Sequence, residues 1–353
     1  MSISVFNHAF QSGLFGDDEV ARAFEASCDV REMLRFEGAL ANAQAQLGIV
    51  PSVSAKTIAK VAAGLQPDMD ALKRATARDG VVVPELVRQL RHAVGEHYAA
   101  HVHLGVTSQD VIDTSLILRL KQVFQLFDQR LTHLIERFDQ LDQVFGGVEL
   151  TGYTRMQVAT PIRVSDRIGA WRAPLARHLQ HVRSLQFPLQ FGGAVGTLDK
   201  FGEYAAPLRA ALATMLGLND VPQWQTQRDY VVAFANALSS ITGSLGKFGQ
   251  DIVLMAEIGD EISIRGGGGS SAMPHKQNPV EAEVLVSLAR FNAIQVSAMH
   301  QSLVHEQERS GAAWTLEWMI LPQMAAATAA ALNMAANITQ NIVSIGKKNK
   351  PQT

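Results

Sequence analysis

One unbroken stretch, from Asp110 to about Phe145, constrains the fold of this chain more than any other feature. Its apolar residues recur every three or four positions, and it contains neither glycine nor proline. The stretch is roughly three times as long as a mean helix of ~11–12 residues. A helix of that length needs partners along its whole apolar face, so the pattern predicts a bundle of long helices.

The same kind of pattern predicts helices along most of the remaining chain. A first short helix is expected to start at Asp17 or Asp18 and to run to about Glu25. No run of alternating polar and apolar residues is convincing as a strand, and residues 152–161 are expected to form a polar loop. Further helices are expected at 29–47, 52–64, 68–78, 82–99, 162–185, 202–216, 228–262, 280–307 and 319–345.

These helices predict an all-α protein. We expect a small N-terminal helical domain over residues 1–108, a central long-helix bundle over 109–346 and a tail over 347–353. The first boundary falls where a polar segment, 101–110, separates the shorter helices from the first long one.

The composition of the chain excludes several classes of protein. Hydrophobic residues make up 47% of its 353 residues, so the chain is globular, and its net charge of −2 gives no basic surface for nucleic acid or an anionic membrane. Cys28 is the only cysteine, which excludes a disulfide framework and fits a reducing compartment. We find neither a signal-peptide pattern nor an uninterrupted apolar stretch of the ~18–20 residues that span a bilayer. We therefore expect a cytoplasmic protein.

Three polar segments, 101–110, 152–161 and 265–279, separate the predicted long helices. The third cannot be helical, because Gly266–Gly269 are four consecutive glycines and two prolines follow them. Antiparallel helices place alternate connections at opposite ends of a bundle, so the three segments need not meet within one subunit. They can meet where several bundles pack together, which favours an active site shared between subunits.

The side chains in these segments do not match several common kinds of site. His101 and His103 are two positions apart, and no carboxylate cluster accompanies them, so we expect no metal site. Gly266–Gly269 lack the spacing of a phosphate-binding loop and a preceding strand, and the serines that follow lack a nucleophile-elbow pattern. A dinucleotide cofactor is not expected either, since no βαβ unit is predicted.

What the segments do suit is proton transfer beside a carboxylate. A carboxylate substrate needs hydroxyl, amide and cationic donors, and an enolate-like intermediate needs preorganised donors as its charge develops. Candidate donors are Thr107, Ser108, Gln157, Thr160, Lys276 and Asn278. A small polycarboxylate substrate and no cofactor are therefore expected.

The three segments also resemble the signature regions of the fumarase/aspartase superfamily, in the same order. Gly269-Ser-Ser-Ala-Met-Pro-His-Lys-Gln-Asn-Pro279 matches its GSSxMPxKxNP loop; His103–Asp110 and Thr154–Pro161 look like its first and second regions. The resemblance spans nearly the whole chain. It implies a long central helical bundle, a homotetramer with active sites built from three subunits, and a C-terminal domain that is short or missing here.

Within this superfamily the second region separates two kinds of enzyme. Lyases such as adenylosuccinate lyase carry a histidine there, paired with a glutamate thirteen residues after the loop serine; here those positions hold Arg155 and Glu283. Loss of the histidine resembles the 3-carboxy-cis,cis-muconate lactonizing enzymes, or cycloisomerases, and the stretches Phe191–Thr197 and His305–Trp318 also look like that subfamily. The resemblance implies lactonization of 3-carboxy-cis,cis-muconate in protocatechuate degradation, the β-ketoadipate pathway.

Alternatives to this activity remain open. Arginine suits an extra anionic group, so Arg155 is also compatible with a sulfomuconate substrate. A β-eliminating lyase of the adenylosuccinate lyase type is the main rival enzyme. A catalytically dead helical oligomer is a rival of another class, against which the intact loop residues argue.

The resemblance and the chemistry together assign roles to individual residues. Ser270 or Lys276 is expected to donate the proton, with Glu283 in a supporting position. Thr107 and Ser108 are either carboxylate ligands or simply the cap of the next helix. The remaining substrate-binding candidates are His103, Arg155, Gln157, Thr160, Ser271 and Asn278.

Overall fold

The structure, a computed structural model, describes residues 4–269, 273 and 277–347. Within these residues the fold is all-α, as predicted, and contains thirteen α-helices. The helices are α1 (Ser12–Phe15), α2 (Asp18–Ala23), α3 (Ala26–Gln46), α4 (Ser52–Gly64), α5 (Met69–Asp79), α6 (Val83–Val94), α7 (Glu96–Ala99), α8 (Ser108–Phe145), α9 (Val164–Ser184), α10 (Ala205–Leu216), α11 (Asp229–Ile258), α12 (Val280–Gln301) and α13 (Gly311–Asn341). Two 3₁₀ helices are η1 (Val5–Asn7) and η2 (Asp199–Tyr204).

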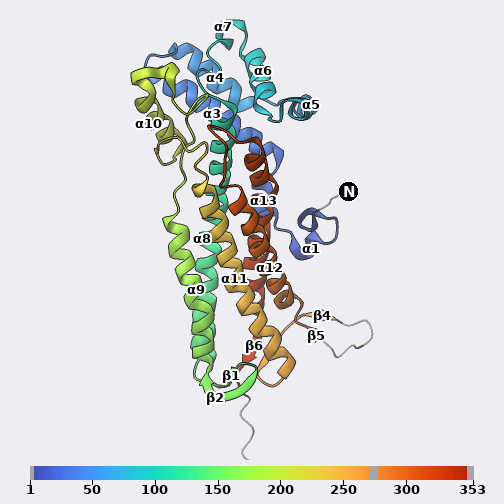
Figure 1. Cartoon of the computed structure of the whole chain (residues 1–353). Helices are drawn as coiled ribbons and strands as arrows, with labels where there is room; N and C mark the ends of the chain where they lie inside the picture. The colour runs from blue at the N-terminus through green and yellow to red at the C-terminus, as the bar shows by residue number, and fades with distance from the viewer. Residues whose placement is uncertain (1–3, 270–272, 274–276, 348–353) are drawn as a thin grey trace, which may run out of the picture.

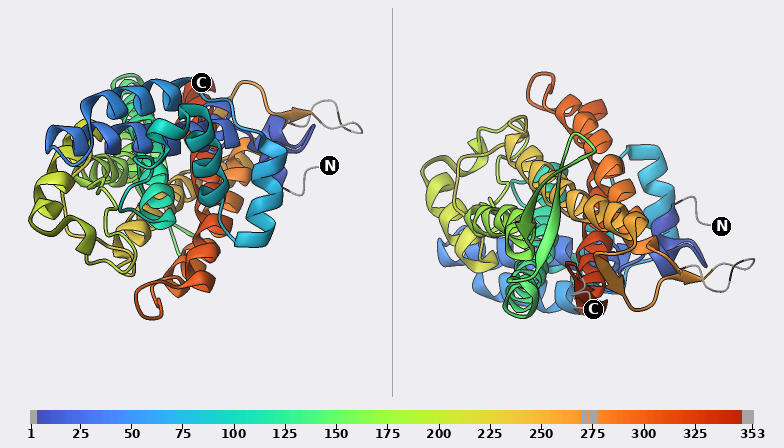
Figure 2. Two further views of the ribbon diagram at one scale, coloured as in Figure 1. Left: turned by 90° about the horizontal axis from the view of Figure 1, so that it is seen from above. Right: turned by 90° about the horizontal axis from the view of Figure 1, so that it is seen from below.

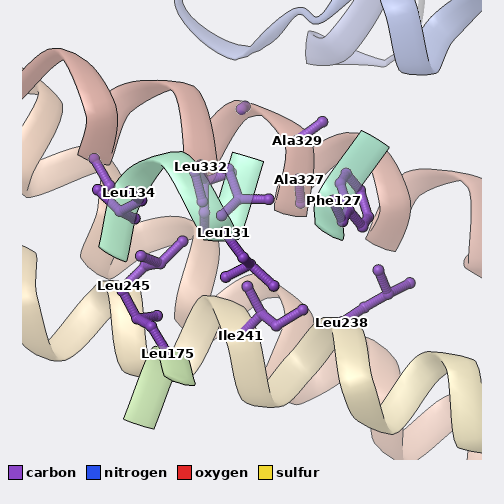
Figure 3. Packing of buried hydrophobic residues seen from close by; sticks show 14 of the residues in the cluster. Phe127, Leu131, Leu134, Leu175, Leu238, Ile241, Leu245, Ala327, Ala329 and Leu332 are labelled. Atoms are coloured by element: carbon purple, nitrogen blue, oxygen red, sulfur yellow. The ribbon is translucent and has the colours of Figure 1, made fainter. Parts of the chain in front are cut away.

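Five long helices, α8, α9, α11, α12 and α13, form an elongated bundle (Figure 1). The predicted long helix is confirmed as α8, which has 38 residues and is therefore about 57 Å long. Its apolar stripe meets the neighbouring helices in one continuous core, where side chains from α8, α9, α11 and α13 interdigitate (Figure 3). Examples are Leu131, Leu175, Ile241 and Leu332, each at most 1% exposed.

The helix α13 corrects one expectation from the sequence. By length and composition alone it is apolar enough to cross a membrane, although the sequence analysis found no such stretch. Asparagine, threonine and one proline interrupt its many alanines and hide this character when only unbroken apolar runs are counted. Because 67% of its most apolar window is buried inside the molecule, it is well explained as a core helix of the bundle.

The shorter helices α3–α7 lie across one end of the bundle, beside the N-terminus of α8 (Figures 1 and 2). They surround a second hydrophobic cluster, centred on residues such as Phe36, Ile58 and Leu90. Leu208 and Leu212 of α10 belong to this cluster too, so a segment between two bundle helices returns to pack against the N-terminal helices.

The prediction of a polar loop at 152–161 was wrong, because this segment belongs to a β-hairpin of β1 (Glu149–Thr154) and β2 (Gln157–Arg163). The hairpin covers the other end of the bundle (Figure 2). Almost every residue of β2 is exposed, so no polar–apolar alternation marks it as a strand. The hairpin is tied to the bundle by the backbone N–H of Thr151, which donates to the Glu261 carboxylate at 3.0 Å.

Other short strands explain why some helices end earlier than predicted. The helix α11 stops at Ile258, since Gly259 adopts a left-handed conformation, and the following β3 (Ile262–Ile264) pairs with β6 (Ile342–Ile345). The pairing also ends α13 at Asn341. At its other end α13 begins at Gly311 rather than 319, because the Ser310 side chain caps it.

Candidate functional site

The first signature region lies at one end of the bundle, whereas the second region and the described flanks of the third lie toward the other end (Figure 1). The first region precedes α8 and the second follows it, so about 57 Å of helix separates them. The third region follows the C-terminus of α11, a 30-residue helix about 45 Å long. Gln109 of the first region lies at the opposite end of α11, where its Nε2 donates to the Gln225 carbonyl at 2.8 Å. One small substrate cannot contact all three regions of the same chain.

In the first region, Thr107 is the N-cap of α8, as predicted, and forms a capping box with Asp110. The Thr107 backbone N–H donates to the Asp110 carboxylate at 3.0 Å, and the Thr107 side chain accepts from the backbone N–H of Asp110. Thr107 and Ser108 are both half-buried. They therefore lie at the positive end of a long helix dipole, a place that suits a bound carboxylate.

Asp110 joins this helix start to the glycine-rich segment 191–197. Besides Thr107, its carboxylate accepts hydrogen bonds from the Gly192 and Gly193 backbone N–H groups, at 2.8 and 2.9 Å, and from Gln190 Nε2 at 3.1 Å. Burial raises the pKa of Asp110 to about 6, even though the four hydrogen bonds oppose that rise. The glycine-rich segment thus has a structural role in holding the first region.

One turn further along α8, a buried charge cluster fixes the same end of the bundle. Arg228 donates to Asp113 at 2.7 Å and to Glu317 at 2.6 Å, and all three side chains are fully buried. Burial opposes the charge on Arg228, but the two carboxylates raise its pKa above its ordinary value. Trp314 Nε1 also donates to Asp113, at 2.9 Å. This cluster was not predictable from the sequence, because Asp113 and Glu317 lie on different helices, Arg228 precedes a third, and no local spacing relates them.

The two tryptophans of α13 lie four positions apart on one face of the helix. Trp314 and Trp318 contact each other edge to face, with ring centroids 4.8 Å apart. Arg309, just before this helix, donates from Nε to Gln109 Oε1 at 3.0 Å and from Nη2 to the Ala194 carbonyl at 3.1 Å. The stretch 305–318 therefore packs onto the first region and the glycine-rich segment together.

His103 lies in a loop between the N-terminal helices and α8. Its Nδ1 is 2.6 Å from Oε1 of Glu37, a carboxylate that is almost completely buried on α3. The backbone of His103 is left-handed, with φ of 61°, which is uncommon outside glycine. The sequence singled out His103 but gave no signal for Glu37, which lies 66 positions earlier.

The second region presents its candidates on the exposed hairpin. Arg155 and Met156 form the two-residue turn, and both have positive φ, 48° and 64°, as in a type I′ turn. A cavity of about 800 Å³ lies under the hairpin and is lined by Arg155 and Thr160 together with Arg167 and Lys247. Gln157 is exposed on β2 and does not line this cavity.

The third region is described only in part, and Ser270, Ser271 and Lys276 lie outside the described residues. Its two flanks form a short antiparallel pair, β4 (Gly268–Gly269) and β5 (Gln277–Asn278). Asn278 lines a cavity of about 540 Å³ beside the end of α11. Glu283 is exposed in the first turn of α12 and does not line that cavity.

No group of three or more His, Cys, Asp or Glu side chains suited to a metal ion occurs among the residues that the structure describes.

Comparisons with known proteins agree with the signature regions. The family model described as lyase matches residues 16–294. The 3-carboxy-cis,cis-muconate cycloisomerase of Pseudomonas aeruginosa is 40% identical over 321 residues, which cover 88% of this chain and 70% of that protein. The N-acetyl-S-(2-succino)cysteine lyase of Enterococcus italicus is 30% identical over 336 residues, covering 93% of this chain and 74% of that protein.

A solved structure extends this similarity to three dimensions. The 3-carboxy-cis,cis-muconate lactonizing enzyme from Pseudomonas putida matches with a TM-score of 0.89 and 34% identity, covering 95% of this chain and 77% of that one. The family match, the identities and the shared fold lead to one conclusion. This chain belongs to the lyase family of the fumarase/aspartase superfamily.

Proposed function

We propose that this protein is a 3-carboxy-cis,cis-muconate cycloisomerase, which closes its substrate to a carboxymuconolactone in the degradation of protocatechuate. The observation that carries the proposal is the 40% identity to a cycloisomerase over 88% of this chain. Arg155 supports it, because it occupies the position at which the β-eliminating lyases of the superfamily carry a histidine.

The reaction suits a scaffold without that histidine. One substrate carboxylate attacks the far alkene carbon and forms a C–O bond, while the alkene electrons move toward the conjugated carboxylate. A proton then adds to the alpha carbon. The attacking carboxylate is already ionised and tethered, so no strong base is needed and proximity supplies much of the rate. The remaining requirements are a proton donor and donors that stabilise the developing charge.

The described residues supply part of this set. Thr107 and Ser108, at the N-terminus of α8, are suited to bind one carboxylate. Asn278 and the exposed guanidinium of Arg155 are suited to bind others. The proton comes from Ser270 or Lys276, Ser271 is a further candidate for substrate binding, and neither metal nor cofactor takes part.

The distances within the chain support a site shared between subunits. The first region is separated from the second and third by about 57 and 45 Å of helix. Since one substrate must contact all three, the first region has to come from another copy than the second and third. This agrees with the expected homotetramer with sites built from three subunits. A cytoplasmic location and the absence of nucleic-acid or membrane partners complete the proposal.

The direct test is turnover of 3-carboxy-cis,cis-muconate, followed by ultraviolet absorbance, with the lactone identified by NMR. Loss of the conjugated diene and appearance of a lactone are expected. Lys276→Met and Ser270→Ala, made separately, identify the donor, because the variant that removes it loses most of its turnover. No turnover by the unmodified protein, or near-normal turnover by both variants, contradicts the respective part of the proposal.

One observation favours a second candidate, a β-eliminating lyase. The N-acetyl-S-(2-succino)cysteine lyase of Enterococcus italicus is similar over 93% of this chain. Succinyl adducts of cysteine and of a nucleotide therefore belong in the same substrate panel, where fumarate release is the readout. Sulfomuconate completes the panel, since Arg155 also suits a sulfonate.

A further inference from the structure

The carboxylate of Glu37 on α3 is buried in an unusual way for a charged side chain. Its side chain is 1% exposed. Its Oε1 lies 2.6 Å from His103 Nδ1, while Oε2 has no hydrogen-bond partner among the described residues. Burying a carboxylate is costly unless it is paired. Among the described residues, the His103 imidazole is the only hydrogen-bond partner of the Glu37 carboxylate. Glu37 therefore has a specific relation to His103.

The loop that carries His103 is held in place without Glu37. Gln44, two turns along the same face of α3, donates from Nε2 to the Leu104 carbonyl at 2.8 Å. Arg91 of α6 donates to the Val102 carbonyl at 3.0 Å. Gly105 has positive φ and lies so close to Phe201 that an added Cβ would be 2.3 Å from the ring. Three contacts already fix the backbone, so the pairing of Glu37 acts on the ring of His103.

The conformation of His103 points the same way. Its left-handed backbone is strained for a residue other than glycine, and such strain persists where neighbouring contacts impose it. The strained backbone brings Nδ1 to the Glu37 carboxylate. The side chain keeps 15% of its surface exposed, and none of the residues that the structure describes bonds its Nε2. Nδ1 is therefore paired with a buried carboxylate, whereas Nε2 is available to bind a ligand.

We propose that Glu37 is a positioning residue of the active site, which holds the Nδ1–H of His103 so that Nε2 faces the substrate. The inference rests on the proposed cycloisomerase function, in which His103 precedes the carboxylate-binding start of α8 by four positions. An acceptor on one ring nitrogen selects the tautomer and fixes the direction of the other. Any hydrogen bond or proton that His103 exchanges with the substrate then passes through Nε2.

The test compares three variants at two positions on the same face of α3. Glu37→Leu keeps the bulk but removes the acceptor, and a 10- to 100-fold loss of kcat/KM is expected. Glu37→Gln keeps an acceptor for Nδ1–H and is expected to recover most of that loss. Gln44→Ala is the matched control, because it loosens the same loop without touching His103. It is expected to lower Tm, while its loss of kcat/KM stays smaller than that of Glu37→Leu.

Two further measurements separate positioning from simple loop support. In a His103→Ala background, Glu37→Leu is expected to cause no additional loss of kcat/KM. In ¹⁵N NMR spectra, the neutral ring of His103 is expected to be protonated at Nδ1 in the unmodified protein and in Glu37→Gln, and to lose this preference in Glu37→Leu.

Several results would overturn the proposal. They are less than a twofold loss of kcat/KM in Glu37→Leu, an equal loss in Gln44→Ala, and an unchanged tautomer in Glu37→Leu. If the unmodified protein fails to convert carboxymuconate, the proposed function fails, but the tautomer measurement still decides the role of Glu37. If Glu37→Leu does not fold, the tautomer of the unmodified protein decides it, since protonation at Nε2 contradicts the proposal.

Discussion

The two ends of α8 carry two signature regions that are built in opposite ways. At its N-terminus, polar groups are buried and paired with one another, as shown by the four donors around Asp110 and by the Asp113–Arg228 pair. Past its C-terminus, the hairpin strand β2 is exposed at almost every residue. Arg155 at the turn is exposed and makes no hydrogen bond or ion pair with any described residue.

In the shared site proposed above, the two ends of α8 contribute in different ways. The first region is already ordered by its own chain, so its donors are fixed before a ligand arrives, which lowers the cost of binding. The hairpin strand β1 is tied to the bundle through Thr151, but the exposed strand β2 and its turn have no comparable set of buried partners among the described residues. In the proposed site, the hairpin side chains act on a substrate where another copy brings a first region to them, since the length of α8 separates them from the first region of the same chain.

The largest expected effect comes from mixing two inactive variants. We expect the double variant Thr107→Val/Ser108→Ala to lose most activity. The second parent is the donor variant, Lys276→Met or Ser270→Ala, whichever loses most turnover when tested alone. In hybrid oligomers, a site that takes these regions from different copies is intact in about a quarter of cases. Activity should therefore rise to about a quarter of that of the unmodified protein after joint refolding.

The control for this experiment is the same mixture without refolding, where no subunits exchange. Native mass spectrometry reports whether hybrids have formed. Hybrids that stay as inactive as their parents would contradict the shared site and, with it, the division of labour between the ends of α8.

The buried cluster near the first region gives the next largest effect, on stability. Arg228→Met leaves the carboxylates of Asp113 and Glu317 buried without their cation, so we expect a loss of about 3–5 kcal/mol in the free energy of unfolding. The matched control is Arg183→Met, which removes an exposed pair with Asp128 and should cost less than about 1 kcal/mol. Urea denaturation measures both. Similar losses in the two variants would mean that the first region is not held by its buried charges.

The pH dependence of stability should reveal the burial of Asp110. Its folded pKa is about 6 against an ordinary 3.8, so between these values the folded chain holds a proton that the unfolded chain has released. Stability therefore falls as pH rises from about 4 to about 6, by up to about 3 kcal/mol. Asp110→Asn removes this slope and serves as the reference. Parallel stability curves for the two proteins would show that the carboxylate is not desolvated as the structure indicates.

The contrast also explains which parts of the molecule were predictable from sequence. The helix α8 and its cap at Thr107 were predicted, because apolar periodicity and capping chemistry are local and the helix is long. The hairpin was not, since β2 has no buried face and its turn residues, Arg155 and Met156, replace the Asn-Gly that usually marks a type I′ turn.

Long-range pairs were beyond a single sequence for a different reason. Arg228 meets Asp113 across 115 positions, and Glu37 meets His103 across 66. Such contacts depend on how helices pack, and the spacing of residues along one helix carries no information about its partner. The candidate residues in the three regions were found through the signature motifs. Arg228 and Glu37 belong to no such motif, so the sequence alone did not reveal them.

The smallest expected effect separates the two roles of the hairpin turn, conformation and charge. Arg155→Gly and Met156→Gly each relieve a left-handed residue, and each should stabilise the protein by about 0.5–1 kcal/mol after the added entropy of the unfolded chain is offset. Urea denaturation detects this gain.

If Arg155 binds a substrate carboxylate, only Arg155→Gly should raise KM, because Met156→Gly changes the same turn and keeps the guanidinium. An equal rise in KM for both variants would assign the effect to the shape of the turn. The hairpin would then contribute backbone geometry to the shared site, and its charge would have no part in binding.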